Sequence, residues 1–187
     1  MPILPAEPDI YPSDLLASAA TGASASSDPW WGLYTLARRE KDLVRRLRVL
    51  ELPHYAPLIK RRSRSPAGRV RESYVPLFAN YVFLRGDHEA RRLALTTGCV
   101  SRALEIADSQ ALVRDLAQIY RLIVADAPLL PESLLETGDR VRIRSGPLAG
   151  VEGVILQRRG EERLLVAVEF LQQGASLLME DFQVERL

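Results

Sequence analysis

The spacing of hydrophobic residues changes near residue 130, and each side of that point predicts a different kind of structure. Before it, short apolar runs of strand length alternate with segments in which Leu or Ile recurs at helical spacing. We expect strands there at about residues 30–36, 54–60, 70–78, 80–84 and 99–106, and helices at about 38–51, 88–96 and 108–125. Sequential strands joined by short turns predict an α+β domain, an antiparallel sheet with helices.

Beyond a linker that contains Pro128 and Pro131, the pattern has no helical period and consists of short alternating runs separated by glycines. Short strands at close, regular spacing with glycine turns predict a small all-β barrel. Residues 1–28 are rich in Pro, Ala, Ser and acids and show no period, so we expect a flexible leader. The expected organisation is a leader at 1–28, a domain at 29–126, a linker at 127–136 and a β domain at 137–187.

Charge is distributed unevenly, although the formal net charge is only +1. Residues 38–71 hold twelve Lys or Arg against three acids, whereas residues 1–28 hold four acids and no Lys or Arg. Clustering of this kind indicates a polyanion-binding face. The alternative is that a helix face and a hairpin loop are simply solvated.

The sequence offers little for catalysis, and we expect no enzyme activity, no cofactor and no metal. His54 and His88 are far apart, and neither adjoins a cysteine or carboxylate cluster. No metal-binding His pair, nucleophile elbow or phosphate-binding lysine loop is present. Cys99 lies in an apolar strand, where we expect a core residue rather than a nucleophile. With a single cysteine, no signal peptide and no apolar run of ~20 residues, we expect a cytoplasmic protein without a membrane span.

Motifs in both halves resemble one family of transcription factors. The run Thr137–Val154, with turns at Gly146 and Gly150, resembles the KOW motif, which also occurs in ribosomal proteins. Trp30–Tyr34, the helix after it and Pro76–Phe83 resemble the N-terminal (NGN) domain of the NusG/RfaH family, and Asp181–Glu185 resembles the end of NusG. The resemblance implies an α+β NGN domain followed by a KOW (SH3-like) barrel.

The resemblance also implies a function in transcription elongation and antitermination, without enzymatic chemistry. In this family the NGN domain binds the clamp helices of RNA polymerase and suppresses pausing. The positions that match this surface are Tyr34, Phe78, Tyr81 and Phe83. Because strand alternation puts Tyr81 and Phe83 on one face, the alternative is that some of these rings are core. Upstream or non-template DNA would contact a set of arginines: Arg38, Arg39, Arg61, Arg62, Arg64, Arg69 and Arg71.

For the C-terminal barrel, the resemblance implies a small-subunit ribosomal protein or Rho as partner, bound at Phe170 or Leu171. Leu36 and Ala37 stand where RfaH has its basic, DNA-element-reading pair, whereas Asn80 is RfaH-like. We interpret the chain as a monomeric, operon-specific RfaH-like paralogue. The alternative function is that of a ribosome-associated KOW protein that binds RNA.

Overall fold

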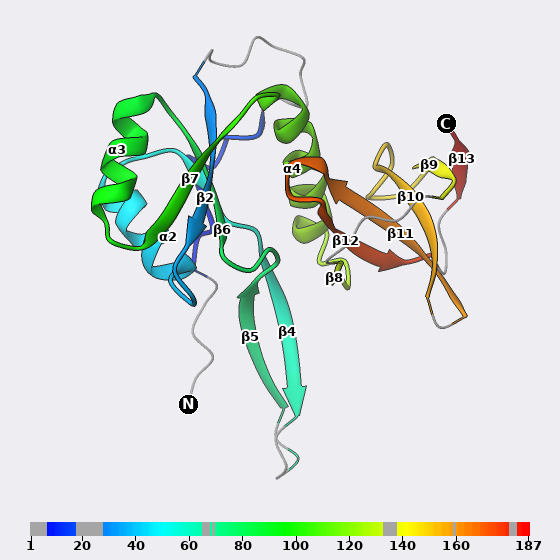
Figure 1. Cartoon of the computed structure of the whole chain (residues 1–187). Helices are drawn as coiled ribbons and strands as arrows, with labels where there is room; N and C mark the ends of the chain where they lie inside the picture. The colour runs from blue at the N-terminus through cyan, green and yellow to red at the C-terminus, as the bar shows by residue number, and fades with distance from the viewer. Residues whose placement is uncertain are drawn as a thin grey trace. The chain divides into compact units, whose positions relative to one another are not determined.

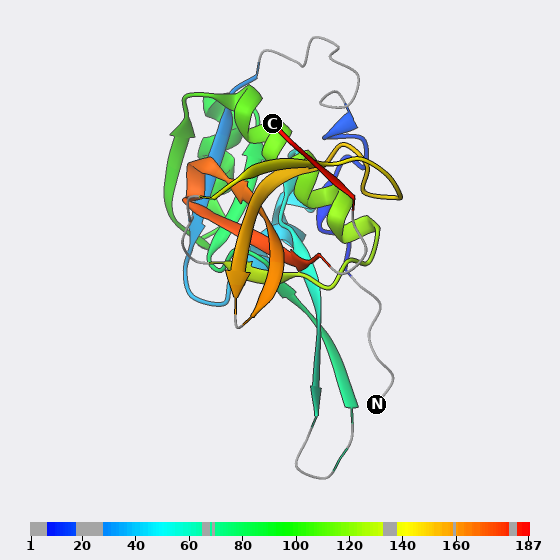
Figure 2. The ribbon, with the colours of Figure 1, turned by 90° about the vertical axis from the view of Figure 1, so that its right-hand side faces the viewer.

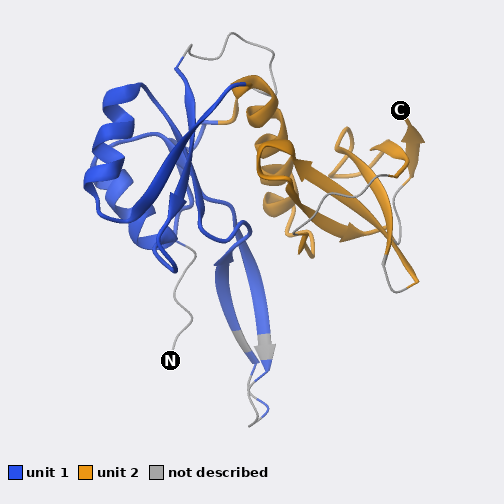
Figure 3. Cartoon of the chain, in the orientation of Figure 1, with its two compact units in different colours: residues 1–15, 24–107 blue, residues 16–23, 108–187 orange. Residues whose placement is uncertain are grey.

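A computed structural model describes residues 7–17, 28–64, 68, 70–132, 138–158, 160–179 and 183–187, with only the backbone of Ser63, Arg71 and Arg158. The chain divides into two compact units (Figure 3). Unit 1 contains residues 1–15 and 24–107, and unit 2 contains residues 16–23 and 108–187. In the described part of the chain, no helix is both long and apolar enough to cross a membrane.

Unit 1 is built on an antiparallel sheet of order β1-β3-β6-β2-β7 (Figure 1). These strands are β1 (Ile10–Tyr11), β2 (Trp30–Thr35), β3 (His54–Tyr55), β6 (Tyr81–Arg85) and β7 (Val100–Ile106). The interior strand β2, between β6 and β7, is the apolar run that the sequence marks most clearly. The α+β architecture expected from the sequence is therefore present.

Two amphipathic helices, α2 (Glu40–Val49) and α3 (His88–Thr96), pack on one face of this sheet. Their buried residues form one cluster with alternate residues of β2 and β6, such as Leu33 and Val82. Asp87 caps α3 by accepting from the Ala90 amide at 2.9 Å, as its sequence position predicts. Cys99 is buried in this cluster, so the expectation that it is a core residue is confirmed.

The leader differs from its prediction, because residues 7–17 are structured. Strand β1 pairs with β3, and the Ala56 amide donates to the Asp9 carbonyl at 2.8 Å. The Asp9 side chain accepts from the Leu58 amide at 3.2 Å, and Arg48 donates to the Pro8 and Ile10 carbonyls. Backbone pairing of this kind needs no hydrophobic period, so the sequence pattern did not signal it. Residues 1–6 and 18–27 of the predicted leader lie outside the described residues.

A long two-stranded hairpin leaves the sheet of unit 1 as a separate ribbon (Figures 1 and 2). It consists of β4 (Leu58–Arg64) and β5 (Val70–Pro76), paired from Leu58↔Pro76 to Arg64↔Val70. Its root adjoins Asp9 through the Leu58 amide. The hairpin expected from the sequence is therefore present, and the N-terminal segment contacts its base.

Unit 2 contains a six-stranded antiparallel sheet of order β13-β9-β10-β11-β12-β8. Its elements are α4 (Ser109–Val124), β8 (Leu130–Glu132), β9 (Arg140–Ile143), β10 (Glu152–Arg158), β11 (Glu161–Val168), the 3₁₀ turn η1 (Glu169–Leu171), β12 (Gln173–Leu178) and β13 (Val184–Arg186). Gly146 and Gly150 have φ angles of 85° and 83°, which confirms the expectation that these turns need conformations that favour glycine.

Two boundaries differ from the sequence expectation. Leu130–Glu132 of the expected linker forms β8, which pairs with β12, and Glu132 accepts from the Ser176 hydroxyl at 2.6 Å. Helix α4, expected to close the first domain, groups with unit 2. Three of its side chains bond to the backbone of the second sheet's turns: Asp115 to the Glu169 amide, Gln118 to the Glu152 amide and Arg121 to the Ala149 carbonyl.

We predict that Asp9→Ala lowers the free energy of unfolding by ~1–3 kcal/mol, because it leaves the part-buried Leu58 amide without its side-chain acceptor. Urea titration measures this change. Exposed Asp14, in the same segment, supplies the matched control Asp14→Ala, which should change little. Equal effects of the two substitutions would show that the Asp9 contact contributes nothing specific.

Candidate functional site

The sheet face opposite α2 and α3 carries a row of aromatic and basic side chains, here called the aromatic row. Tyr34 pairs with Tyr81 on one side and with Arg102 on the other, so these three residues lie side by side across β6, β2 and β7. The two tyrosine rings meet edge to face with centroids 5.2 Å apart. The Arg102 guanidinium carbon lies 5.4 Å from the Tyr34 ring centroid. Both tyrosines are only partly buried, and Arg102 is exposed.

Phe78 and Phe83 occupy a different environment, since their exposed fractions are 1% and 0%. Their rings pack edge to face with centroids 6.4 Å apart. For these two rings the structure therefore favours the alternative left open by the sequence, that some of the four aromatic residues are core side chains. Phe83 does lie on the same sheet face as Tyr81, as alternation predicts, and it pairs with Gly32.

Sequence reasoning missed two members of the exposed face, Arg102 and Leu104. Leu104 pairs with Gly32 and is 39% exposed. Because Arg102 and Leu104 are two residues apart in one expected strand, alternation could have predicted that they share a face. Only the pairing of β7 with β2 shows that this face is the one that carries Tyr34. The accessible surface is therefore Tyr34, Tyr81, Arg102 and Leu104.

Two basic segments that are distant in sequence meet at one end of the unit 1 sheet. The loop that carries Arg38 and Arg39 leads from β2 into α2, and the hairpin root leads into β6 (Figure 1). The buried Glu40 carboxylate accepts from the Asn80 amide at 2.8 Å, and the Thr35 amide donates to the Asn80 carbonyl at 2.8 Å. These bonds hold the Arg38 loop against the segment that joins the hairpin to β6, whereas Arg61 and Arg64 lie further out along the hairpin.

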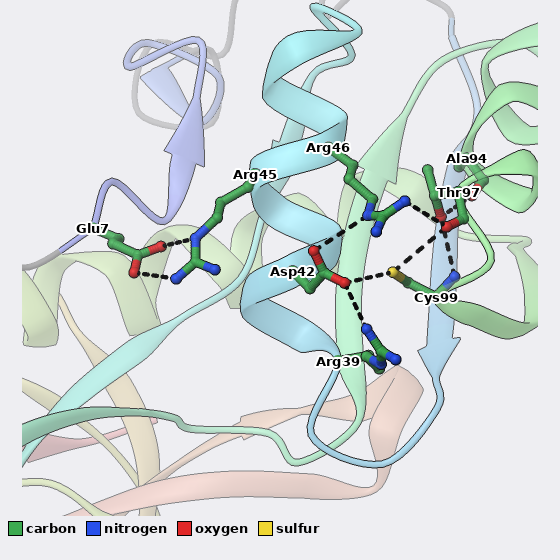
Figure 4. Close-up of polar contacts among 8 residues, drawn as sticks. All are labelled: Glu7, Arg39, Asp42, Arg45, Arg46, Ala94, Thr97 and Cys99. Carbon is green, nitrogen blue, oxygen red and sulfur yellow. Dashed lines mark hydrogen bonds and ion pairs between the residues drawn. The ribbon is translucent and has the colours of Figure 1, made fainter.

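Most arginines of α2 are already paired (Figure 4). Asp42 accepts from Arg39 at 2.9 Å and from Arg46 at 3.2 Å, and these bonds, from Arg46 first, hold its pKa below the usual range. Arg45 forms a two-pronged ion pair with Glu7, at 2.8 and 2.6 Å. The high positive count of residues 38–71 therefore overstates the charge available to a ligand. Arg38 is exposed, with no described ion pair among the placed residues.

In the hairpin, some of the arginines expected to bind nucleic acid already form an ion pair and others have none among the described residues. Arg62 is paired with Glu72 at 2.6 Å. Arg61 and Arg64 are exposed and have no described ion pair among the placed residues. Arg69 lies outside the described residues, and only the backbone of Arg71 is described.

In unit 2, Phe170 and Leu171 lie in η1 and are partly buried. The turn is held at its start by Asp115 of α4, which accepts from the Glu169 amide at 3.0 Å. Gln172, with a φ of 53°, ends the turn in a left-handed conformation. Burial raises the pKa of Asp115 from 3.8 to about 6. The loop expected to bind a partner is thus anchored by a carboxyl that titrates in the mildly acidic range.

Other chemistry has little geometric support in the described part of the chain. No group of three or more His, Cys, Asp or Glu side chains there could hold a metal ion. His54 is buried, its Nδ1 lies 2.7 Å from the Leu52 carbonyl, and burial lowers its pKa. Burial also raises the pKa of the Cys99 thiol, which disfavours the reactive thiolate.

The sequence model of one protein family, described as "Transcription termination factor nusG", matches residues 28–132, more than half of the 187-residue chain. No curated protein sequence matches the chain. The aromatic row and both basic segments lie inside the matched range, whereas η1 and strands β9 to β13 lie outside it.

We predict that Phe78→Ala lowers the free energy of unfolding by ~3–5 kcal/mol, the usual cost of emptying a buried aromatic site. Denaturant titration followed by the fluorescence of Trp30 and Trp31 measures the change. Phe78→Leu, which keeps most of the buried volume, should cost markedly less. A loss below ~1 kcal/mol for the alanine variant would contradict the core assignment.

We predict that Asp115 contributes a fall in the free energy of unfolding as pH rises from about 4 to about 6, because the folded state retains an Asp115 proton that the unfolded chain releases. Carboxyls with lowered pKa, such as Asp42 and Glu72, act in the opposite direction, so the contribution of Asp115 is the difference between the unsubstituted chain and a variant at this position. Asp115→Asn keeps an amide oxygen for the Glu169 amide and should remove this contribution. Urea titrations across this pH range measure it, and exposed Asp126→Asn, in the turn after α4, is the control. An unchanged pH profile for Asp115→Asn would contradict the prediction.

Proposed function

The chain belongs to the NusG family of transcription factors, and we propose that it binds the clamp helices of RNA polymerase through the aromatic row. The observation that carries this proposal is the accessible surface of Tyr34, Tyr81, Arg102 and Leu104 within the region that matches the family. Tyrosine and arginine are, with tryptophan, the residue types enriched among those that dominate binding energy at interfaces.

The chemistry of the aromatic row suits a helical partner. The tyrosine rings and Leu104 offer apolar surface, and Arg102 adds one positive charge at the edge of this surface. An amphipathic helix that places apolar side chains over the rings and an acidic side chain beside Arg102 would match both features. Phe78 and Phe83 are buried, so the proposal gives them no contact with the partner.

Binding alone explains the proposed effect on transcription, so the proposed function is not enzymatic. A factor that prefers the closed, elongating state of the polymerase shifts the population towards that state and away from pausing. The size of the shift is limited by the difference between the affinities of the factor for the two states. No proton transfer or nucleophile takes part.

The basic end of unit 1 is proposed to contact upstream or non-template DNA. Arg38 and the hairpin arginines Arg61 and Arg64 are exposed and without described ion partners. The bonds of Asn80 hold the Arg38 loop against the segment that joins the hairpin to the sheet. Contacts to phosphates would give an affinity that falls with salt and depends little on sequence. Arg39 and Arg62 contribute less, because Asp42 and Glu72 neutralise them.

Unit 2 is proposed to form the KOW barrel and to recruit a ribosomal protein or Rho through η1. Phe170 and Leu171 supply partly exposed apolar surface in a short turn, which suits an edge contact with another protein.

The operon-specific, RfaH-like role receives less support from Asn80 than the sequence suggested. Asn80 has a φ of 65°, a left-handed conformation that glycine and asparagine both adopt readily. Asparagine here, where housekeeping members place glycine, therefore satisfies the same backbone requirement. The proposal is accordingly that of a general NusG-type elongation factor, and specialisation would have to come from other residues.

We predict that Tyr34→Ala and Tyr81→Ala each weaken binding to purified RNA polymerase about tenfold or more, as expected for central interface residues. A direct titration of the full chain against polymerase measures this. Val49→Ala removes an 83% exposed apolar side chain from α2 and should leave affinity unchanged.

Failure of polymerase to retain the unmutated chain at low salt would overturn the proposal. In that case, sedimentation with ribosomal subunits in an extract depleted of polymerase would favour the ribosome-associated alternative.

A further inference from the structure

The two faces of the β4–β5 hairpin carry different charges. Strand register puts the pairs Lys60↔Tyr74 and Arg62↔Glu72 on one face and the pair Arg61↔Ser73 on the other. Arg61 and Arg62 are therefore neighbours in sequence, on the same strand, that point to opposite sides of the ribbon. Their electrostatic surroundings can be compared directly.

On the first face, Glu72 holds two cations. Its carboxylate accepts from Arg62 Nε at 2.6 Å and lies 3.3 Å from Lys60 Nζ. These bonds, from Arg62 first, lower the pKa of Glu72, so the carboxylate keeps its negative charge. A phosphate approaching this face would have to compete with Glu72 for both cations and would meet its negative charge. Arg64 also lies on this face, nearer the hairpin tip and outside the Glu72 pair.

The second face has no such competition at Arg61. Its guanidinium is exposed, opposite the exposed Ser73, and has no described ion pair among the placed residues. A guanidinium presents two parallel N–H groups to a phosphate, and a serine hydroxyl can donate a further hydrogen bond. Arg61 and Ser73 therefore offer a phosphate several hydrogen-bond donors, and the residue opposite Arg61 is not an acid.

Building on the proposed contact with DNA, we propose that the hairpin binds the phosphate backbone through its Arg61–Ser73 face. Lys60 and Arg62 take little part in this binding, because both are paired with Glu72. At the level of Glu72, the Arg61–Ser73 face lies against the duplex and the Glu72 pair points away from it, whereas Arg64, nearer the tip and outside that pair, stays available to phosphate. Because phosphate contact reads no bases, the hairpin contributes affinity and orientation rather than sequence preference.

The test compares Arg61→Ala with Arg62→Ala in the full chain. Both variants lose one positive charge from the same strand, so long-range attraction falls similarly and the difference between them isolates direct contact. The measurement is affinity for a short DNA duplex of mixed sequence across a range of salt concentrations. Arg61→Ala should lower affinity about three- to tenfold and reduce the slope of log affinity against log salt by about one. Arg62→Ala should lower affinity less than about twofold.

Glu72→Gln supplies a change in the opposite direction. It frees Lys60 and Arg62 for phosphate, so the hairpin can then bind through either face, and affinity should rise about threefold or more with a steeper salt slope. All three side chains belong to a ribbon outside the main sheet, and urea midpoints check that each variant stays folded.

Large and equal losses for the two arginine variants would overturn the face assignment while leaving the hairpin's DNA contact intact. No loss for either, with no gain for Glu72→Gln, would overturn both the face assignment and the proposed DNA contact. Polymerase affinity, titrated separately without DNA, reports on the aromatic row independently of either outcome.

Discussion

The antiparallel pairing of β2 with both β6 and β7 is the constraint on which unit 1 depends. This pairing determines which residues of the three strands face the helices, because successive residues of a strand point to opposite faces of the sheet. Leu33 and Val82 lie opposite each other in the core, so Tyr34 and Tyr81, one step away, must lie on the other face. The aromatic row is therefore a consequence of the same register that builds the core. A one-residue slip would bury the tyrosines and expose the leucines.

The spacing of apolar residues along the sequence was sufficient to predict most elements of unit 1. Leu43 and Leu47 recur at helical spacing and form the buried stripe of α2, and Asp87 caps α3 where its sequence position indicates. Alternation likewise predicted that Tyr81 and Phe83 share a face. It could not predict that Phe83 is buried and Tyr81 is only partly so, because exposure depends on the neighbours that the fold brings together and not on alternation.

Features made by long-range backbone pairing were not predictable from the pattern. The two residues of β1 are too few to show a period, and Pro131 in β8 is typical of a linker rather than a strand. Both segments became strands because a neighbouring edge offered them partners, β3 in one case and β12 in the other.

The charge of the binding surface was also only partly predictable from the sequence. A count along the chain located the basic region correctly, but the ligand-binding capacity of each arginine depends on which acid lies beside it in space. Asp42 lies one turn from Arg46, so their pairing could have been foreseen from helical spacing. The ion pairs of Glu7 with Arg45 and of Glu72 with Arg62 could be identified only from the folded structure.

The central claim is that the Tyr34 side of the sheet contacts the polymerase. The most direct measurement places a photocrosslinking amino acid at position 34 and maps the crosslink formed with purified RNA polymerase. The account predicts a crosslink to the clamp helices, lost when an excess of the unmodified chain is added. A crosslink elsewhere on the enzyme, or none while the chain remains bound, would contradict it.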